Sequence, residues 1–339
     1  MRAIVYDAPR SFCVAEVPEL EPGPGQARLR VELTGVCGTD LHIHEGRFIS
    51  RFPLTPGHEV VGVVDALGTG ADGLELGQRV VPNGNWGCGV CGECVRGRPL
   101  FCLAFTALGV TDPGGFAEQM LAPAAQCFPV DDLEPEVAVL AEPTACAVHG
   151  MDVLDLRPGS DVLLLGAGPT GLVLAQLLLH GGAARLTVAA PTAFKLERAR
   201  AFGADEVVQI ARDDQASAVA SLQELAPRGF DTVVDATGSA AVSEVTLSLL
   251  RDGGTALWYG LAREDERVAV SPYEIFRREL TIKGSFAQVD GFPRAVAFLR
   301  AGRVRTEGIV THRFPLDEYG SALNAVRNEP GALKAVVAP

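Results

Sequence analysis

Four of the eight cysteines in this 339-residue chain fall within one glycine-rich stretch, GCGVCGECVRGRPLFC at residues 87–102. They are separated by two, two and seven residues: Cys88, Cys91, Cys94 and Cys102. Four thiolates at short separations suit a tetrahedral zinc site, which is structural because no position stays open for a substrate. The alternatives are an iron–sulfur cluster and four unmetallated thiols. The cluster fits less well, because the fourth cysteine comes seven residues on rather than three and is followed by Leu103 instead of proline.

Disulfide bonds are a poor explanation of these cysteines. A chain of this length with 47% apolar residues can bury large cores without covalent crosslinks. The N-terminus, MRAIVYDAPR, has no apolar signal core, and eight cysteines are too dilute for a secreted disulfide framework. We therefore expect a cytoplasmic protein in which Cys13, Cys127 and Cys146 are buried free thiols.

A second set of metal-binding residue types is spread along the chain. The motif CGTD supplies Cys37, GHE supplies His58 and Glu59, and LAEP supplies Glu142. Sulfur, nitrogen and carboxylate together make a mixed donor set of the kind that leaves one zinc position open for water or substrate. Zinc lowers the pKa of a bound water to about 7 and would act likewise on an alcohol. We therefore predict oxidation of an alcohol through an alkoxide that releases hydride.

This reaction also releases a proton, which needs a hydroxyl beside a metal ligand and a titratable group nearer the solvent. Thr39 lies two residues after Cys37, and His42 has an ordinary pKa of about 6.5 that suits transfer at neutral pH. The alternative is that both residues only cap a helix or a turn. We expect His44 to be a surface or pocket-wall residue.

From about residue 150, apolar strands alternate with amphipathic helices, which indicates a parallel sheet with helices on both faces. The uncharged run at residues 162–179 has about the length of a membrane span, but its glycines and proline favour a strand, a tight turn and a helix. A G-x-G-x-x-G motif in that context predicts a dinucleotide site, with the pyrophosphate at the helix N-terminus. The candidate residues are Gly166, Gly168, Pro169, Thr170 and Gly171.

The choice of dinucleotide depends on the end of the next strand. About twenty residues past the glycines, NAD enzymes keep an acidic residue for the ribose 2′-OH. Ala190 stands at that position, so no carboxylate repels a 2′-phosphate, and Thr192 and Lys195 are placed to contact one. We predict NADP(H) over NAD(H). The alternative is that Ala190 tolerates both cofactors and Lys195 is a solvated helix residue.

The first 145 or so residues alternate short apolar runs with Gly and Pro turns, which is typical of a small antiparallel barrel. The tail is too short for a core of its own, and we expect it to return to this first domain. The predicted fold class is α/β: a mainly antiparallel β catalytic domain of residues 1–147 and 287–339, and a Rossmann doubly wound sheet of residues 148–286. A net charge of −13 argues against nucleic-acid binding.

Together these motifs resemble those of the zinc-dependent medium-chain alcohol and polyol dehydrogenases, over essentially the whole chain. In that family the Cys of CGTD and the His of GHE bind the catalytic zinc, and the third ligand is the Glu of GHE or the residue at Glu142. The resemblance implies a GroES-like catalytic domain, a structural zinc in the four-cysteine loop, relay roles for Thr39 and His42, and a homodimer or homotetramer paired through residues 280–286. It also places four residues beside the nicotinamide: Ala236, Gly238, Gly260 and Ser285.

Glu142 stands where the ethanol-oxidising branch of the family has a cysteine, and its Glu-Pro pair resembles the sorbitol, threonine and related secondary-alcohol branch. We expect a polyol or sugar alcohol and its ketose as the small-molecule substrate. Threonine is an alternative, although threonine dehydrogenases usually carry His where this chain has Asn85. A catalytically silent dinucleotide sensor is a third interpretation. Such a protein should have lost a metal ligand, and all four candidates are present.

Overall fold

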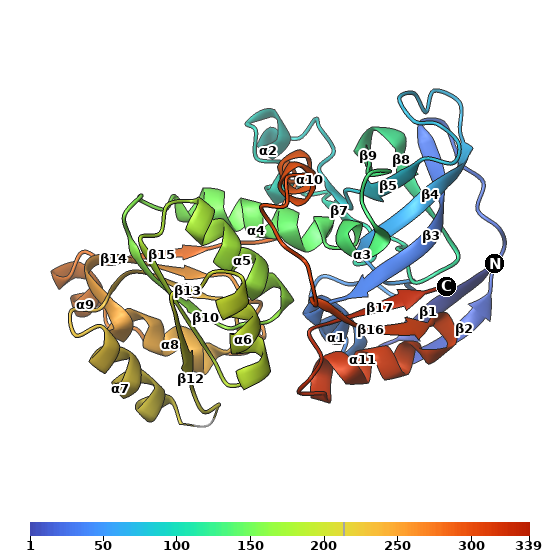
Figure 1. The fold of residues 1–339 in the computed structure, drawn as a ribbon. Helices are drawn as coiled ribbons and strands as arrows, with labels where there is room; N and C mark the ends of the chain where they lie inside the picture. Colours follow the sequence, from blue (N-terminus) through green and yellow to red (C-terminus); the bar gives the residue numbers. More distant parts are fainter. Residues whose placement is uncertain (213) are drawn as a thin grey trace. The chain divides into compact units, whose positions relative to one another are not determined.

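The structure is a computed structural model that describes residues 1–212 and 214–339, and they form two compact units (Figure 1). Unit 1 comprises residues 1–145, 287–302 and 306–339, and unit 2 comprises residues 146–286 and 303–305. The first boundary lies two residues before the expected one. The short segment 303–305 falls in unit 2 because the Gln176 side chain bonds the backbone N–H and C=O of Arg305, at 2.7 and 3.1 Å.

Unit 2 is built on a six-stranded parallel sheet in the order β12-β11-β10-β13-β14-β15. Its strands are nearly continuous apolar runs, as expected where both faces of a sheet are covered. Helices α5 and α6 cover one face, and α7 and α8 cover the other (Figure 1). The elements are β10 (Asp161–Leu165), α5 (Pro169–His180), β11 (Arg185–Ala190), α6 (Ala193–Ala201), β12 (Glu206–Gln209), α7 (Gln215–Leu225), β13 (Phe230–Asp235), α8 (Ala240–Leu249), β14 (Leu250–Trp258), α9 (Pro272–Arg277) and β15 (Thr281–Gly284).

Unit 1 is built on a seven-stranded sheet in the order β16-β17-β3-β4-β5-β9, with β8 also paired to β3. The pairs are antiparallel except β16 with β17, which is parallel. The tail returns to this sheet as expected, because β17 pairs directly with β3. The elements are β1 (Arg2–Ala8), β2 (Ser11–Glu16), β3 (Gln26–Val36), α1 (Gly38–His44), β4 (Glu59–Leu67), β5 (Arg79–Pro82), β8 (Gln119–Pro123), β9 (Cys127–Pro129), α3 (Pro135–Ala138), α10 (Phe292–Arg300), β16 (Val310–Pro315), α11 (Tyr319–Asn328) and β17 (Lys334–Ala338). Helix α4 (Ala141–Leu154) begins in unit 1, and its residues from Cys146 on belong to unit 2.

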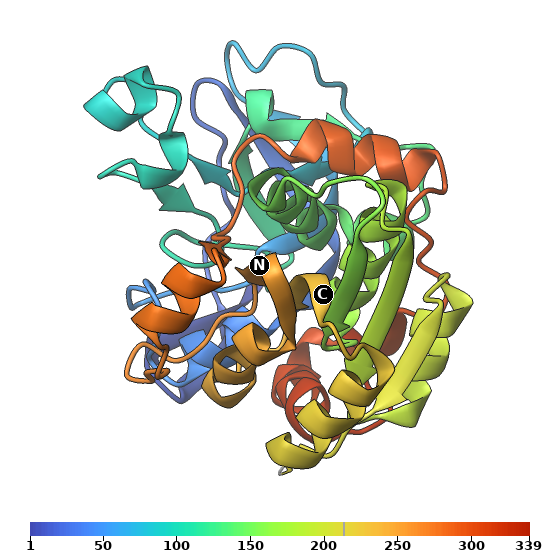
Figure 2. The same ribbon diagram turned by 90° about the vertical axis from the view of Figure 1, so that its left-hand side faces the viewer.

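A small lobe carries the four-cysteine stretch and stands out from the sheet of unit 1, drawn in teal in Figure 2. Its elements are short: β6 (Asn85–Trp86), α2 (Gly92–Val95), the 3₁₀ turn η1 (Pro99–Phe101) and β7 (Thr106–Ala107). Four of its large apolar side chains are more than half exposed: Val90, Val95, Phe101 and Leu103. The lobe therefore has little hydrophobic core of its own.

Two apolar segments bear on the sequence-based expectations. The run at residues 162–179 forms β10, a turn and most of α5, as predicted. A different segment, Pro135–Leu154, which contains α3 and α4, has the length and the apolar composition of a membrane-spanning helix. Two thirds of its apolar window is buried in the fold (67%), as in the core helix of a globular protein.

The three remaining cysteines differ in exposure. Cys127 is buried in β9, and burial raises the pKa of its thiol to about 12. Cys146 is half-buried. The expectation of a buried thiol was wrong for Cys13, which is exposed because the two-stranded sheet of β1 and β2 leaves one face of β2 open to solvent.

Candidate zinc and dinucleotide sites

The pairing of β3 with β4 brings the predicted catalytic ligands together. Cys37 follows β3 as the N-cap of α1, and Glu59 begins β4 directly after His58. In the antiparallel register Gly35 lies opposite Glu59, so the two strand ends meet. One donor atom each of Cys37, His58 and Glu59 lies within 4.8 Å of the other two. A thiol, an imidazole and a carboxylate thus converge as a metal site requires.

Glu142, the fourth predicted ligand, does not belong to that close set. It lies in the first turn of α4 and is half-buried. Its negative charge still raises the pKa of both His58 and Lys334, so the carboxylate acts electrostatically on the same site. The structure therefore places Glu59 in the close set of donor atoms and Glu142 outside it.

Asp40 is an additional member of the site, which the sequence analysis left without a role. It is buried, and its Oδ1 lies 3.7 Å from His58 Nδ1. Burial raises the pKa of Asp40 to about 6, although His58 opposes this. Neither atom has a hydrogen-bond partner among the described residues. A carboxylate behind a histidine is the usual support of a metal-bound imidazole, and its position in CGTD was the available signal.

Lys334 is the second residue that sequence reasoning missed. Its Nζ lies 2.7 Å from both Glu59 oxygens and 3.3 Å from the Val36 carbonyl, and both charged side chains are buried. Burial lowers the pKa of Lys334, but the charges of Glu59, Cys37 and Glu142 raise it above its ordinary value. The charges of Asp40, Cys37 and Glu142 raise the pKa of His58 well above its ordinary value, although burial lowers it. The site therefore attracts positive charge, which fits a resident metal cation.

The two predicted relay residues lie on α1. Thr39 Oγ1 is 3.8 Å from Cys37 Sγ, and His42 follows one turn later. The helix begins at Cys37, whose N–H donates to Asp40 Oδ2 at 2.7 Å, so Asp40 rather than Thr39 caps it. His44 at the last turn is a pocket-wall residue, as expected. It lines a cavity of about 140 Å³ together with Phe12 and other residues.

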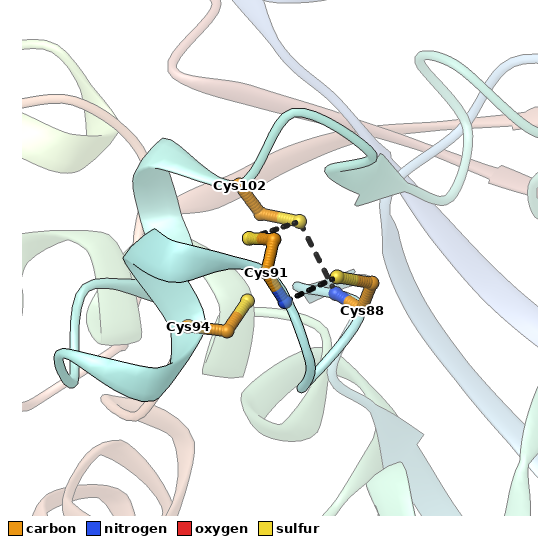
Figure 3. A group of neighbouring side chains, drawn as sticks. All are labelled: Cys88, Cys91, Cys94 and Cys102. Atoms are coloured by element: carbon orange, nitrogen blue, oxygen red, sulfur yellow. Dashed lines mark hydrogen bonds between the residues drawn. The ribbon is translucent and has the colours of Figure 1, made fainter.

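The four cysteines of the lobe surround a common point as free thiols (Figure 3). The sulfurs of Cys91 and Cys102 are 3.7 Å apart, far from the 2.05 Å of a disulfide bond. Backbone amides donate to them, from Cys91 to Cys88 Sγ at 3.3 Å and from Cys88 to Cys102 Sγ at 3.2 Å. Backbone N–H groups of Val90 and Cys91 lower the pKa of Cys88, and that of Cys94 lowers the pKa of Cys91 to about 6, whereas burial raises the pKa of Cys94 to about 12. Four sulfur ligands, which leave no coordination position open, fit a structural zinc.

The predicted glycine loop joins β10 to α5. Gly166 has φ of +106°, a conformation that side chains rarely adopt. A Cβ at Gly171 would overlap the Gly166 carbonyl oxygen, so this glycine allows the helix to pack on the turn. A Cβ at Gly168 would meet nothing within 4 Å, which leaves open space at the N-terminus of α5. Pro169 and Thr170 form the first turn of that helix, where free amides can bind phosphate.

The predicted ribose residues follow the end of β11. Ala190 is the last residue of this strand, Thr192 is the N-cap of α6, and Lys195 lies in its first turn. The pKa of Lys195 is lowered by burial and by the positive charge of Arg212, which follows β12. Arg212 is thus a second cation near this strand end, and the sequence analysis did not identify it.

The remaining predicted cofactor residues lie at the carboxyl ends of the neighbouring strands. Ala236 follows β13 and donates its N–H to Leu165 O at 2.9 Å. Gly238 has φ of +70°, and a Cβ at Gly260 would overlap its backbone. Ser285 follows β15 and donates its N–H to Trp258 O at 3.3 Å. This edge of a doubly wound sheet is where dinucleotides bind.

Comparison with known proteins agrees with this arrangement. The model of the alcohol dehydrogenase GroES-like domain matches residues 23–132, and the zinc-binding dehydrogenase model matches residues 169–301. A D-arabinitol dehydrogenase 1 from Uromyces fabae is 46% identical over 100% of this chain and 97% of its own length. The chain belongs to the zinc-dependent medium-chain alcohol and polyol dehydrogenase family. The predicted family and α/β fold class are thereby confirmed.

Further members of the family extend the comparison. A D-altritol 5-dehydrogenase from Agrobacterium fabrum is 35% identical over 98% of both chains. An L-threonine 3-dehydrogenase from Yersinia pestis is 30% identical over 95% of this chain and 94% of its own length. The solved structure of a zinc-binding dehydrogenase from Sinorhizobium meliloti bound to NADP has a TM-score of 0.92 and 32% identity, covering 100% and 99% of the two chains. This member of the family is accordingly an NAD(P)-dependent dehydrogenase with a zinc site.

Proposed function

We propose that this dehydrogenase oxidises a polyol at a secondary hydroxyl to the corresponding ketose, using NADP(H). The observation that carries the substrate class is Glu142 in place of the cysteine found in the ethanol-oxidising branch, together with the 46% identity to a D-arabinitol dehydrogenase. The identity to the threonine enzyme is lower, at 30%, and supports that alternative less.

In the proposed reaction, Cys37 and His58 would hold the catalytic zinc, and Glu59 or Glu142 would complete the protein ligands. Bound zinc would polarise the substrate hydroxyl and favour its alkoxide. The Asp40 carboxylate, 3.7 Å from His58 Nδ1, would support the metal-bound imidazole electrostatically. Thr39, beside Cys37, accepts the hydroxyl proton and passes it to His42 on the same helix.

The preference for NADP(H) rests on charge at the ends of β11 and β12. Ala190 leaves no carboxylate at the strand end, and Lys195 and Arg212 supply two cations near it. A 2′-phosphate would be attracted there, whereas NAD(H) would lack its usual acidic partner. The zinc-binding dehydrogenase with NADP bound is consistent with this choice.

Three further properties belong to this proposal. We expect two zinc ions per chain, one in each cysteine-containing site. We expect a homodimer or homotetramer, because β15 is an edge strand with one side unpaired among the described residues. We also expect a cytoplasmic location, because eight cysteines in 339 residues are too dilute for a secreted disulfide framework.

A spectrophotometric screen of pentitols, hexitols, threonine and simple alcohols with both cofactors tests the proposal, with zinc analysis on the same sample. The expected result is the highest kcat/KM for a polyol, at least a tenfold preference for NADP, and two zinc ions per chain. A higher kcat/KM for threonine or for a simple alcohol would overturn the substrate class. A tenfold preference for NAD would overturn the cofactor assignment alone.

A further inference from the structure

The pair of Lys334 and Glu59 is the most deeply buried ion pair of unit 1 that touches the catalytic metal residues. Side-chain exposure is 3% for Lys334 and 0% for Glu59. The ammonium has three donors, and all three are used: two by the Glu59 oxygens and one by the Val36 carbonyl. Both oxygens of a predicted metal ligand are therefore already bonded to a cation.

Three adjacent strands fix this geometry. Glu59 begins β4, Gly35 lies opposite it on β3, and Gly35 in turn lies opposite Val336 on β17, two residues after Lys334. A Cβ at Gly35 would overlap Glu59 Oε2, so the missing side chain makes the space in which the carboxylate lies. The arrangement is a built feature of the sheet, since it needs a glycine, a glutamate and a lysine on three different strands.

A buried carboxylate pairs with a nearby cation, because leaving its charge unpaired in the interior costs several kcal/mol. Glu59 has two candidates: the Lys334 ammonium at 2.7 Å, and a metal held by Cys37 and His58, whose donor atoms lie within 4.8 Å of a Glu59 oxygen. We propose that Lys334 is a positioning residue that competes with the zinc for the Glu59 carboxylate and so keeps Glu59 an exchangeable ligand. This inference rests on the catalytic zinc assigned above.

The competition has a definite direction. Without the ammonium, the metal is the only cation left for Glu59, so the carboxylate binds it persistently and zinc leaves more slowly. Because Lys334 acts through Glu59, its removal has no such effect once Glu59 has lost its charge. A purely structural role would instead loosen the site and speed the release of zinc in both backgrounds.

The test measures the release of zinc from the full-length holoenzyme to a chromogenic chelator. Of the release phases, the one that is absent in Cys37→Ser belongs to the catalytic site. Lys334→Met is expected to slow this phase tenfold or more. Lys334→Arg, which keeps the positive charge, should release zinc at a rate within about threefold of that of the unchanged protein. The matched control is Lys283→Met, a lysine that donates to the Leu154 carbonyl at 2.8 Å in unit 2, and it leaves the phase unchanged.

A double-mutant cycle completes the test. In the Glu59→Gln background, adding Lys334→Met is expected to leave the release rate unchanged, and the visible spectrum of the Co²⁺-substituted site should differ between Lys334→Met and the unchanged protein. If Lys334→Met fails to fold, Lys334→Gln, which keeps a donor without the charge, should slow release in the same direction. Equal or faster release in the single variant, or the same effect in both backgrounds, overturns the inference. The absence of any phase sensitive to Cys37→Ser contradicts the catalytic zinc itself.

Discussion

At the scale of residues, the candidate zinc site gathers more acidic groups than basic ones. Cys37, Asp40, Glu59 and Glu142 act electrostatically on Lys334 or His58. These groups raise the pKa of both cations against the effect of burial. A divalent metal held by Cys37 and His58 would supply the missing positive charge, and its binding should release protons from the ligands.

A variant of Glu142 tests how the carboxylate outside the close set contributes to the reaction. Glu142→Gln removes its charge while keeping its shape, and we expect kcat to fall 10- to 100-fold with two zinc ions retained. Steady-state kinetics with metal analysis measures both. The matched control is Glu136→Gln, an exposed acid on α3 that should leave kcat unchanged. An unchanged kcat in Glu142→Gln would remove this residue from the site.

His44 gives a prediction of pH dependence. Its pKa is lowered, mainly by burial and then by Arg327, and its Nδ1 lies 2.9 Å from the Tyr6 hydroxyl. Because the unfolded state binds the proton more readily, His44 contributes stability that is complete above pH 6.5 and declines as the pH falls toward the folded pKa. Urea unfolding between pH 5 and 7.5 should therefore show a smaller loss of stability on acidification for His44→Gln than for the unchanged protein. Equal losses would contradict the role of His44.

At the scale of elements, two short segments carry predicted binding sites. They are the turn from β10 to α5, for the dinucleotide, and the cysteine lobe, for the structural zinc. Neither depends mainly on apolar burial. The turn needs Gly166 at φ of +106°. The lobe has helices and strands of only two to four residues and exposes its apolar side chains, so the sulfur cluster must hold it together.

The glycines of the turn have separable tasks. Gly168→Ala should leave the melting temperature nearly unchanged, because a Cβ there meets nothing within 4 Å, but should raise the Kd for NADPH tenfold or more by entering the phosphate space. Gly171→Ala should cost about 1–3 kcal/mol of stability through its overlap with Gly166. Thermal melts and NADPH fluorescence titrations distinguish the two. A reversed pattern would place the pyrophosphate elsewhere.

The cysteine lobe should lose its order with its metal. Cys91→Ala is expected to lower the zinc content from two ions to one per chain and to make residues 87–103 sensitive to proteases, while the rest of the chain stays resistant. Limited proteolysis with mass spectrometry and metal analysis measures this. Cys13→Ala, at an exposed thiol outside both clusters, serves as the control. A resistant lobe with one zinc ion lost would mean that the metal is dispensable for its fold.

At the scale of the whole molecule, the proposed assembly follows from the open edge of the unit 2 sheet. Strand β15 ends the strand order, and Tyr273 and Phe276 on the preceding helix α9 are 68% and 81% exposed. Aromatic side chains beside an unpaired strand favour pairing with a second copy.

Phe276→Glu should weaken this pairing, since it buries a charge in the interface. Sedimentation analysis is expected to show dissociation toward monomers at concentrations where the unchanged protein is oligomeric. Leu76→Glu, at another side chain with 67% exposure in unit 1, should leave the oligomer intact. An oligomer unaffected by Phe276→Glu would move the interface away from α9.

Local patterns in the sequence predicted the fold class, the glycine turn and the four-cysteine site, whereas the catalytic ligand set was implied by the resemblance to the dehydrogenase family. Their information lies within a few residues: cysteine spacing, apolar periodicity and glycines between a strand and a helix. Only the tertiary structure revealed the groups that arrive from distant strands. Lys334 reaches Glu59 across 275 residues, and Arg212, just after the next strand, approaches Lys195. No local pattern predicts these contacts, because the register of strand pairing decides which buried charges meet, and in the interior each charge must have a partner.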